Sequence, residues 1–140
     1  MNFVLDNSIT MRWFFGDGMH QELAYATGVL SAMEANVAVV PVIWRLEVSN
    51  VLARAEWKGL VTEARSSSFL SLLSELDIEV DMNTVDHALS DTLQLARRYA
   101  LSSYDASYLE LALRHGLSLA SLDEDLMKAA EKSGVKRFVP

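Results

Sequence analysis

Short apolar runs alternate with longer helical patterns along the chain, and this alternation limits the fold more than any other feature of the sequence. The runs cover residues 3–5 (FVL), 37–40 (VAVV), 78–80 (IEV), 117–120 (LSLA) and 137–139 (RFV). Nearly continuous apolar runs are typical of strands that are buried on both faces. The order strand–helix–strand therefore favours an α/β protein whose parallel sheet is covered by helices on both faces.

The segments between these runs carry helical periodicity and the signals of helix ends. Thr62 is placed to cap one helix, and Pro41 suits the first turn of another. Gly59, Gly116 and Gly134 each follow a helical pattern, where a left-handed cap is expected. The expected helices cover residues 9–15, 21–35, 42–59, 63–76, 84–99, 102–115 and 124–133.

Composition and length bound the class of protein. The 140 residues, of which 51% are hydrophobic, are expected to form one domain over residues 1–140. Because there are no cysteines, any metal must be held by oxygen ligands or by the three histidines. The longest apolar run, residues 37–44, is broken by Pro41 and is far shorter than a bilayer span of about 20 residues. We therefore expect a cytoplasmic protein with no membrane partner.

The net charge of −7 argues against a protein that binds nucleic acid through a globally basic surface. It leaves open a nuclease whose own metal ions neutralise phosphates locally, and it also suits a basic protein partner.

Asp105 stands out within the helical stretch at residues 102–115. At 3.6 residues per turn it shares a face with Tyr108, Leu109 and Ala112, which should point toward the core. The opposite face, with Ser107, Glu110 and Arg114, is expected to face solvent. A buried carboxylate needs a proton, a hydrogen bond or a cation, so the position of Asp105 calls for an explanation.

Three further carboxylates occupy comparable places, and each has an ordinary structural alternative. Asp6 ends the first apolar run and is also placed to cap a helix. Glu47 points into an apolar helix face, unless it pairs with Arg54 or Arg12.

The other two acids have capping alternatives. Ser102 and Asp105 have the spacing of a capping box, and Asp123 is placed to cap the last helix. In a parallel α/β sheet, however, Asp6, Glu47, Asp105 and Asp123 are expected to meet beyond the carboxyl ends of the strands. Clustered carboxylates repel one another unless a divalent cation joins them, and oxygen ligands select Mg²⁺ or Mn²⁺.

The segments FVLDNS, VPVIWRLEVSNVL and SSYDASYLELALRHGLSLASLDEDLMKAA resemble, in order and spacing, the PIN-domain nucleases. They are most similar to the VapC toxins of toxin–antitoxin pairs. The resemblance implies a three-layer α/β/α sandwich with a five-stranded, mostly parallel sheet. The acidic quartet of the family corresponds to Asp6, Glu47, Asp105 and Asp123, with Ser8 and Ser121 in supporting positions.

The family further implies an Mg²⁺-dependent endoribonuclease, with Mn²⁺ as a possible substitute. In this interpretation Asp6 and Asp105 bind the metal directly, while Glu47 and Asp123 complete the site and orient the attacking water. The expected partners are an RNA substrate, a cognate antitoxin that offers a basic side chain to the acidic groove, and a second copy in a homodimer. Contact with operator DNA is expected only through the antitoxin.

Other functional classes have weaker support. A PIN-like binding module without catalysis, acting in a regulatory complex, is the main alternative. A phosphatase or a receiver-type phosphoacceptor would also suit such a sheet. A receiver, however, needs an acid pair before its first helix and a lysine near its last strand, and neither is evident here. The sequence contains no Walker loop, GxGxxG, GxSxG or HExxH motif.

Overall fold

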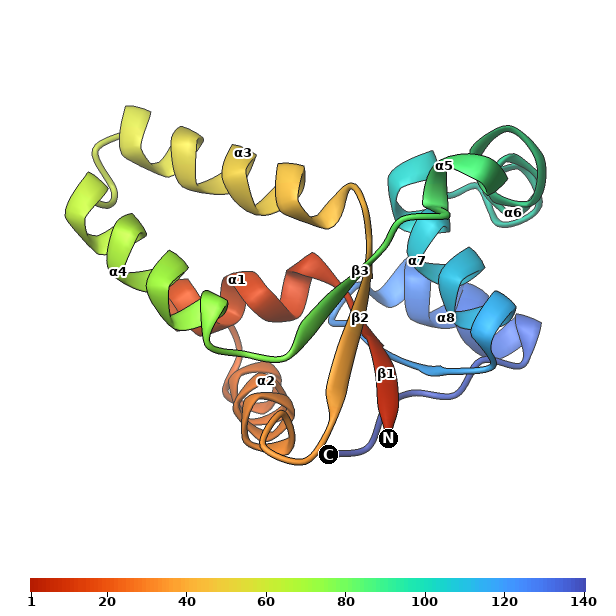
Figure 1. Cartoon of the computed structure of the whole chain (residues 1–140), viewed down its shortest axis with the longest axis horizontal. Coiled ribbons are helices and arrows are strands. Elements are labelled where there is room, and N and C mark those ends of the chain that lie inside the picture. Colours follow the sequence, from red (N-terminus) through yellow and green to blue (C-terminus); the bar gives the residue numbers. More distant parts are fainter.

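The apolar runs form a parallel sheet in the computed structural model of residues 1–140 (Figure 1). Its four strands are β1 (Asn2–Leu5), β2 (Val37–Pro41), β3 (Ile78–Asp81) and β4 (Ser118–Ala120), in the spatial order β3-β2-β1-β4. All three pairings are parallel, with Val4 aligned to Val39 on one side and to Leu119 on the other. The carboxyl ends of the strands therefore lie together at one edge.

Helices cover both faces of the sheet and give the three layers that the sequence predicts. The helices α1 to α4 lie on one side of the strands and α5 to α8 on the other (Figure 1). Their bounds are α1 (Asn7–Phe15), α2 (His20–Ala32), α3 (Trp44–Trp57), α4 (Glu63–Ser74), α5 (Thr84–His87), α6 (Leu93–Tyr99), α7 (Ser103–His115) and α8 (Glu124–Ser133).

Several local expectations are confirmed and one is refined. The Thr62 hydroxyl accepts the N–H of Arg65 and caps α4. Gly116 and Gly134 adopt left-handed caps after α7 and α8. The single helix expected over residues 84–99 is instead interrupted by a π-helix at Ala88–Thr92, between α5 and α6.

The expected fifth strand at residues 137–139 does not form. Arg137 makes only an isolated parallel bridge to Leu119, with backbone hydrogen bonds of 2.9 Å from Leu119 to Lys136 and from Phe138 to Leu119. The ladder has little room to extend, because β4 has three residues and Pro140 has no N–H to donate. The sheet therefore has four strands, not five.

Pro41 also differs from its expected place in the first turn of a helix. It is the last residue of β2, where it aligns with Asp81 of β3, and α3 begins only at Trp44. A proline is tolerated at the end of a strand because few ladder bonds remain for it to interrupt.

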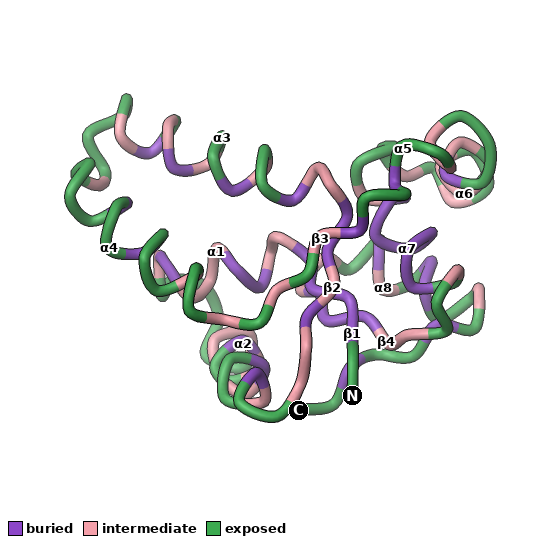
Figure 2. The backbone as a smooth tube through the Cα atoms, in the orientation of Figure 1, coloured by how far each residue is buried: buried purple, intermediate pink, exposed green.

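The core is formed by the strands and by α7, whose backbone is buried over most of its length (Figure 2). Phe3, Val4 and Leu5 of β1 are fully buried, as are Leu109 and Leu111 of α7. The helix packs against β1, β2 and β4 on one side and against α5, α6 and α8 on the other. Because α7 lies between the sheet and the other helices on its face, the middle of α7 has almost no side exposed to solvent.

The prediction that Ser107, Glu110 and Arg114 face solvent is therefore wrong. Ser107 and Glu110 are buried, and the Arg114 side chain is only 17% exposed. Arg114 donates to both oxygens of Glu110 at 2.8 and 2.9 Å, and to both oxygens of Asp81 at the end of β3. One guanidinium thus compensates two carboxylates and joins α7 to β3.

These bonds also act on Asp81. Burial pushes its pKa upward, but hydrogen bonds from Arg114 and from the Thr84 hydroxyl outweigh burial and leave the pKa below its ordinary value.

None of the helices has both the length and the apolar character that crossing a membrane requires.

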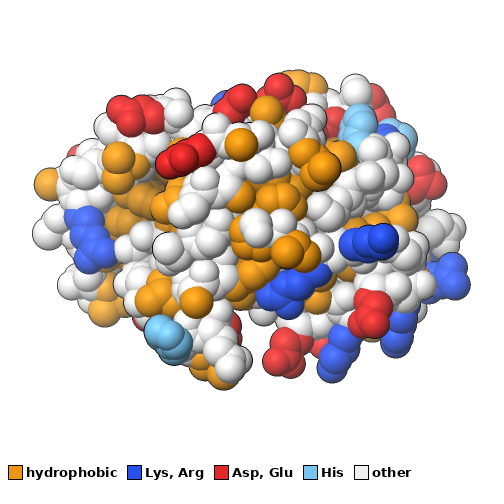
Figure 3. Space-filling model, turned by 90° about the horizontal axis from the view of Figure 1, so that it is seen from below, with side chains coloured by type: hydrophobic (Ala, Val, Ile, Leu, Met, Phe, Trp, Pro, Cys, Tyr) orange, Lys and Arg blue, Asp and Glu red, His pale blue; other side chains and the backbone are white.

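On the face that points down in Figure 1, apolar side chains gather across the middle while acidic side chains lie mostly toward the edges (Figure 3).

Candidate active site

Asp6 and Asp123 follow two neighbouring strands whose connecting helices lie on opposite faces of the sheet. Asp6 directly follows β1, and Asp123 follows the neighbouring strand β4. A backbone hydrogen bond of 3.0 Å from Asp6 to Ala120 ties the two strand ends together. The connection after β1 runs through α1 and α2 on one face, whereas β4 follows α7 on the other. Such a switch point is where ligands of open α/β sheets usually bind.

Two hydroxyls fix the Asp6 carboxylate in one orientation. Asp6 is only 4% exposed, and its Oδ2 accepts from Ser8 at 2.6 Å and from Ser121 at 2.7 Å. The same hydroxyls accept backbone N–H groups of Leu122 and Asp123, each at 3.0 Å. The hydroxyl protons therefore have to point at Asp6. Ser8 and Ser121 are thus placed as the sequence interpretation requires of supporting residues.

Asp123 serves as a helix cap, as the structural alternative proposes. Its Oδ1 accepts the N–H of Leu126 at 2.9 Å and caps α8. This bond uses one of its two carboxylate oxygens. Asp6 occupies the corresponding position before α1 but makes no side-chain capping bond.

Glu47 and Asp105 reach the same region from helices on opposite faces of the sheet. Glu47, on α3, is half-buried, and its Oε1 accepts the hydroxyl of Tyr108 at 2.5 Å. Asp105 is half-buried in the first turn of α7, where its N–H donates to the Ser102 hydroxyl at 3.0 Å. The capping role of Ser102 is therefore confirmed.

The pKa values show that these carboxylates sense one another. Burial raises the pKa of Glu47 to about 7, with further increments from the charges of Asp6 and Asp105 and a partial offset from the Tyr108 hydrogen bond. Burial likewise raises the pKa of Asp105 to about 6, and the charges of Asp6 and Asp123 add to it. The pKa of Asp6 is raised by burial and by Asp123, against the lowering effect of its two serine hydroxyls.

No basic side chain relieves this repulsion. The ion pairs of the protein join Arg12 to Asp17 and Glu22, and Arg114 to Asp81 and Glu110. The ring of His87 lies near Asp91 and Glu110. Glu47 therefore does not form the alternative pairing with Arg12 or Arg54. The four candidate acids share one electrostatic environment with no cation in it.

The donor set suits a hard divalent cation, but the ligands are not preassembled. All four candidates offer carboxylate oxygens, and none is engaged by a lysine or arginine. No group of three or more histidine or carboxylate side chains lies close enough together to hold a metal ion. Holding an ion here would require the carboxylates to draw closer.

Tyr108 is the contributor that sequence reasoning missed. It was expected in the core because it lies on the apolar face of its helix, and its ring is indeed fully buried. Its hydroxyl, however, reaches Glu47 across the site. The available signal was its position one turn after Asp105, on the same face of the helix.

The sequence profile described as the PIN domain matches residues 3–132. The chain belongs to the PIN domain family. One relative is Ribonuclease VapC3 of Pyrobaculum aerophilum, 32% identical over 80 residues, which make up 57% of this chain. The matched segment spans 61% of the length of that relative, which is less than two thirds of it.

Solved structures share the PIN fold over nearly the whole chain. PAE2754 from Pyrobaculum aerophilum superposes with a TM-score of 0.65 at 23% identity, covering 92% of this chain and 87% of its own. VapBC2 from Rickettsia felis, bound to a DNA fragment from its promoter, gives 0.67 at 11% identity, covering 99% and 98%. FitAcB from Neisseria gonorrhoeae gives 0.56 at 16% identity, covering 100% and 98%. These likenesses establish the fold.

The raised pKa of Glu47 predicts a pH-dependent stability of definite sign. Between its ordinary value of 4.5 and about 7, the folded protein binds more protons than the unfolded chain, so stability falls as pH rises through this window. In E47Q no charge forms, and the amide oxygen still accepts from Tyr108. Metal-free E47Q should be more stable than wild type at pH 8 by about 1 kcal/mol, after allowance for solvent screening, or a few degrees in Tm.

Thermal unfolding followed by circular dichroism in EDTA checks this, with both proteins measured at pH 4.5 and pH 8. The difference should shrink at pH 4.5, where Glu47 is protonated in the folded protein and about half protonated in the unfolded chain. Equal midpoints at pH 8 would contradict the raised pKa.

Proposed function

We propose that this PIN domain is a metal-dependent endoribonuclease that acts as the toxin of a toxin–antitoxin pair in the cytoplasm. The observation that carries the proposal is the electrostatic coupling of Asp6, Glu47, Asp105 and Asp123 with no basic side chain to relieve it. The relative named a ribonuclease supports the choice of substrate.

In this proposal Asp6 and Asp105 hold Mg²⁺, or Mn²⁺ in its place, and Glu47 and Asp123 complete the site. The ion, when bound, would supply charge stabilisation for the phosphate and lower the pKa of a water. An oxygen-only donor set favours such hard cations over softer ones.

The residues of the chain contribute orientation. Ser8 and Ser121 hold the Asp6 carboxylate fixed, so its geometry does not have to be restored in each turnover. Glu47 would complete the site through Oε2, because Oε1 already accepts the Tyr108 hydroxyl.

The proposal predicts that D105N loses cleavage but not folding. Total RNA incubated with enzyme in millimolar Mg²⁺ should be cut by wild type, with a rate loss of more than about 100-fold in D105N. The loss of a ligand should exceed the 10–100-fold effect typical of outer partners. D77N is the matched control, since Asp77 is exposed just before β3, at the opposite edge of the sheet.

Thermal stabilisation by Mg²⁺ or Mn²⁺ separates the enzyme from the non-catalytic binding module. Wild type and D77N should be stabilised, and D105N much less. An active, Mg²⁺-responsive D105N would refute the assignment, whereas no response in wild type would favour the binding module.

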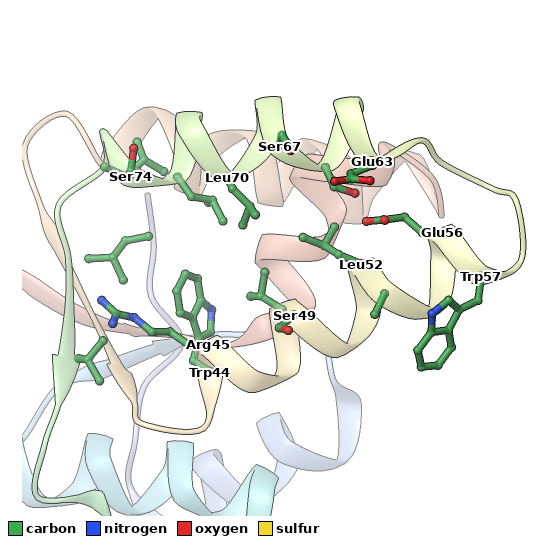
Figure 4. Close-up of a pocket in the computed structure, with 17 residues that line it drawn as sticks. Trp44, Arg45, Ser49, Leu52, Glu56, Trp57, Glu63, Ser67, Leu70 and Ser74 are labelled. Carbon is green, nitrogen blue, oxygen red and sulfur yellow. The ribbon is translucent and has the colours of Figure 1, made fainter.

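A groove between α3 and α4 suits the antitoxin in this proposal. The cavity measures about 760 Å³, and Leu52 and Leu70 project into it from the two helices (Figure 4). Arg45 lies toward one end and Glu56 and Glu63 toward the other (Figure 4). An amphipathic segment with an apolar face would fill this groove, and a basic side chain beyond it would compete with the metal. The similarity to VapBC2, which was solved bound to a DNA fragment from its promoter, supports this partner. In the proposal, the antitoxin makes any contact with operator DNA.

The proposed homodimer has separate support. Leu46 at the start of α3, with Met82, Val85 and Leu89 after β3, are large apolar side chains between 67% and 89% exposed. Apolar side chains of this size, exposed in number, are common at protein–protein interfaces.

The antitoxin groove can be tested with two substitutions on one helix. L70E places a charge in the groove and should abolish copurification with the cognate antitoxin when the two proteins are coexpressed. L72E is the control, because Leu72 is exposed on α4 but does not line the groove. Retention of the partner by L70E, or its loss from both variants, would count against this surface.

A further inference from the structure

A single side-chain hydrogen bond joins α3 to α7 across the candidate site, and it is the bond from Tyr108 to Glu47. The two residues are 61 positions apart in the chain. The other side-chain hydrogen bond of α3 runs from Trp44 to Thr10 of α1. The Tyr108 hydroxyl therefore provides the only side-chain hydrogen bond between Glu47 and α7, the helix that carries Asp105.

Tyr108 is itself rigidly placed. Its side chain is fully buried, as are those of Leu109 and Leu111, on a helix that packs against β1, β2 and β4. A phenol ring has few rotamers, and burial removes those that remain. The bond from its hydroxyl to Glu47 at 2.5 Å satisfies a donor that burial would otherwise leave unpaired. The backbone N–H of Asn7 also acts on the Tyr108 oxygen.

Glu47 has no comparable support of its own. It is half-buried on α3, forms no ion pair, and accepts no other side-chain hydrogen bond. A glutamate side chain has three torsions to restrict, and one hydrogen bond to a fixed donor removes much of that freedom. The bond engages Oε1 and leaves Oε2 without a hydrogen-bond partner, in a carboxylate that senses the charges of Asp6 and Asp105.

We infer that Tyr108 is a positioning residue that holds the Glu47 carboxylate with one oxygen free toward Asp105, so that a divalent ion meets an ordered ligand. This inference rests on the proposed function. It assigns to a core tyrosine a role that its burial alone would not suggest. Outer partners of metal ligands commonly change metal affinity by 10–100-fold when they are removed.

The test is Y108F, which keeps the ring and removes the hydroxyl. Calorimetric titration with Mn²⁺ should give a Kd about ten-fold weaker than wild type, and the loss in RNA cleavage should appear in kcat more than in KM. Y104F is the matched control, because Tyr104 lies one turn earlier on α7 and is 61% exposed. It should bind Mn²⁺ like wild type.

A double-mutant cycle separates positioning from general damage to the fold. If Tyr108 acts through Glu47, Y108F should weaken Mn²⁺ binding much less in an E47Q background than in wild type. An equal loss in both backgrounds, or a wild-type Kd in Y108F, would overturn the inference.

A measurement without metal distinguishes this inference from the proposed function. NMR relaxation should show that the Glu47 side chain is more mobile in metal-free Y108F than in wild type and Y104F. Unchanged mobility would overturn positioning. Increased mobility in a protein whose wild type binds no Mn²⁺ would support the positioning contact and reject the metal site.

Discussion

The burial of Asp6 at the junction of β1 and β4, with two hydroxyls beside it and no cation, is the constraint on which the site depends. Parallel pairing of these strands brings Asp6 and Asp123 to one edge of the sheet. Helices on opposite faces then bring Glu47 and Asp105 into the same electrostatic environment. The chain accepts this repulsion, which costs stability, at a place where a sheet of this kind binds ligands.

A second group of buried carboxylates shows how the same protein neutralises acids in a structural role. Asp81 and Glu110 share the guanidinium of Arg114, and the pKa of Asp81 falls despite its burial. The candidate site has the opposite character, because the pKa values of Asp6, Glu47 and Asp105 rise and no lysine or arginine pairs with them. Two acid clusters in one small domain thus differ in what compensates them, and only one leaves room for a cation.

Local sequence signals predicted four of the five expected strands and the capping roles of Thr62, Ser102 and Asp123. They did not predict what tertiary packing decides. The outer face of α7 looked polar, and only the fold shows that Arg114 is enclosed with Glu110 and Asp81. The fifth strand failed because pairing depends on the length of its neighbour β4. Likewise, no spacing rule connects Tyr108 to Glu47, since their contact exists only once α3 and α7 flank the same sheet edge.

In this account, a divalent ion that binds at the site displaces protons from the carboxylates of Glu47 and Asp105. Mn²⁺ titrations at pH 6.5, repeated in two buffers of different ionisation enthalpy, measure the protons released on binding. With pKa values of about 7 for Glu47 and about 6 for Asp105, the account predicts release of about one proton per bound ion. Binding without proton release, or no binding at all, would contradict it.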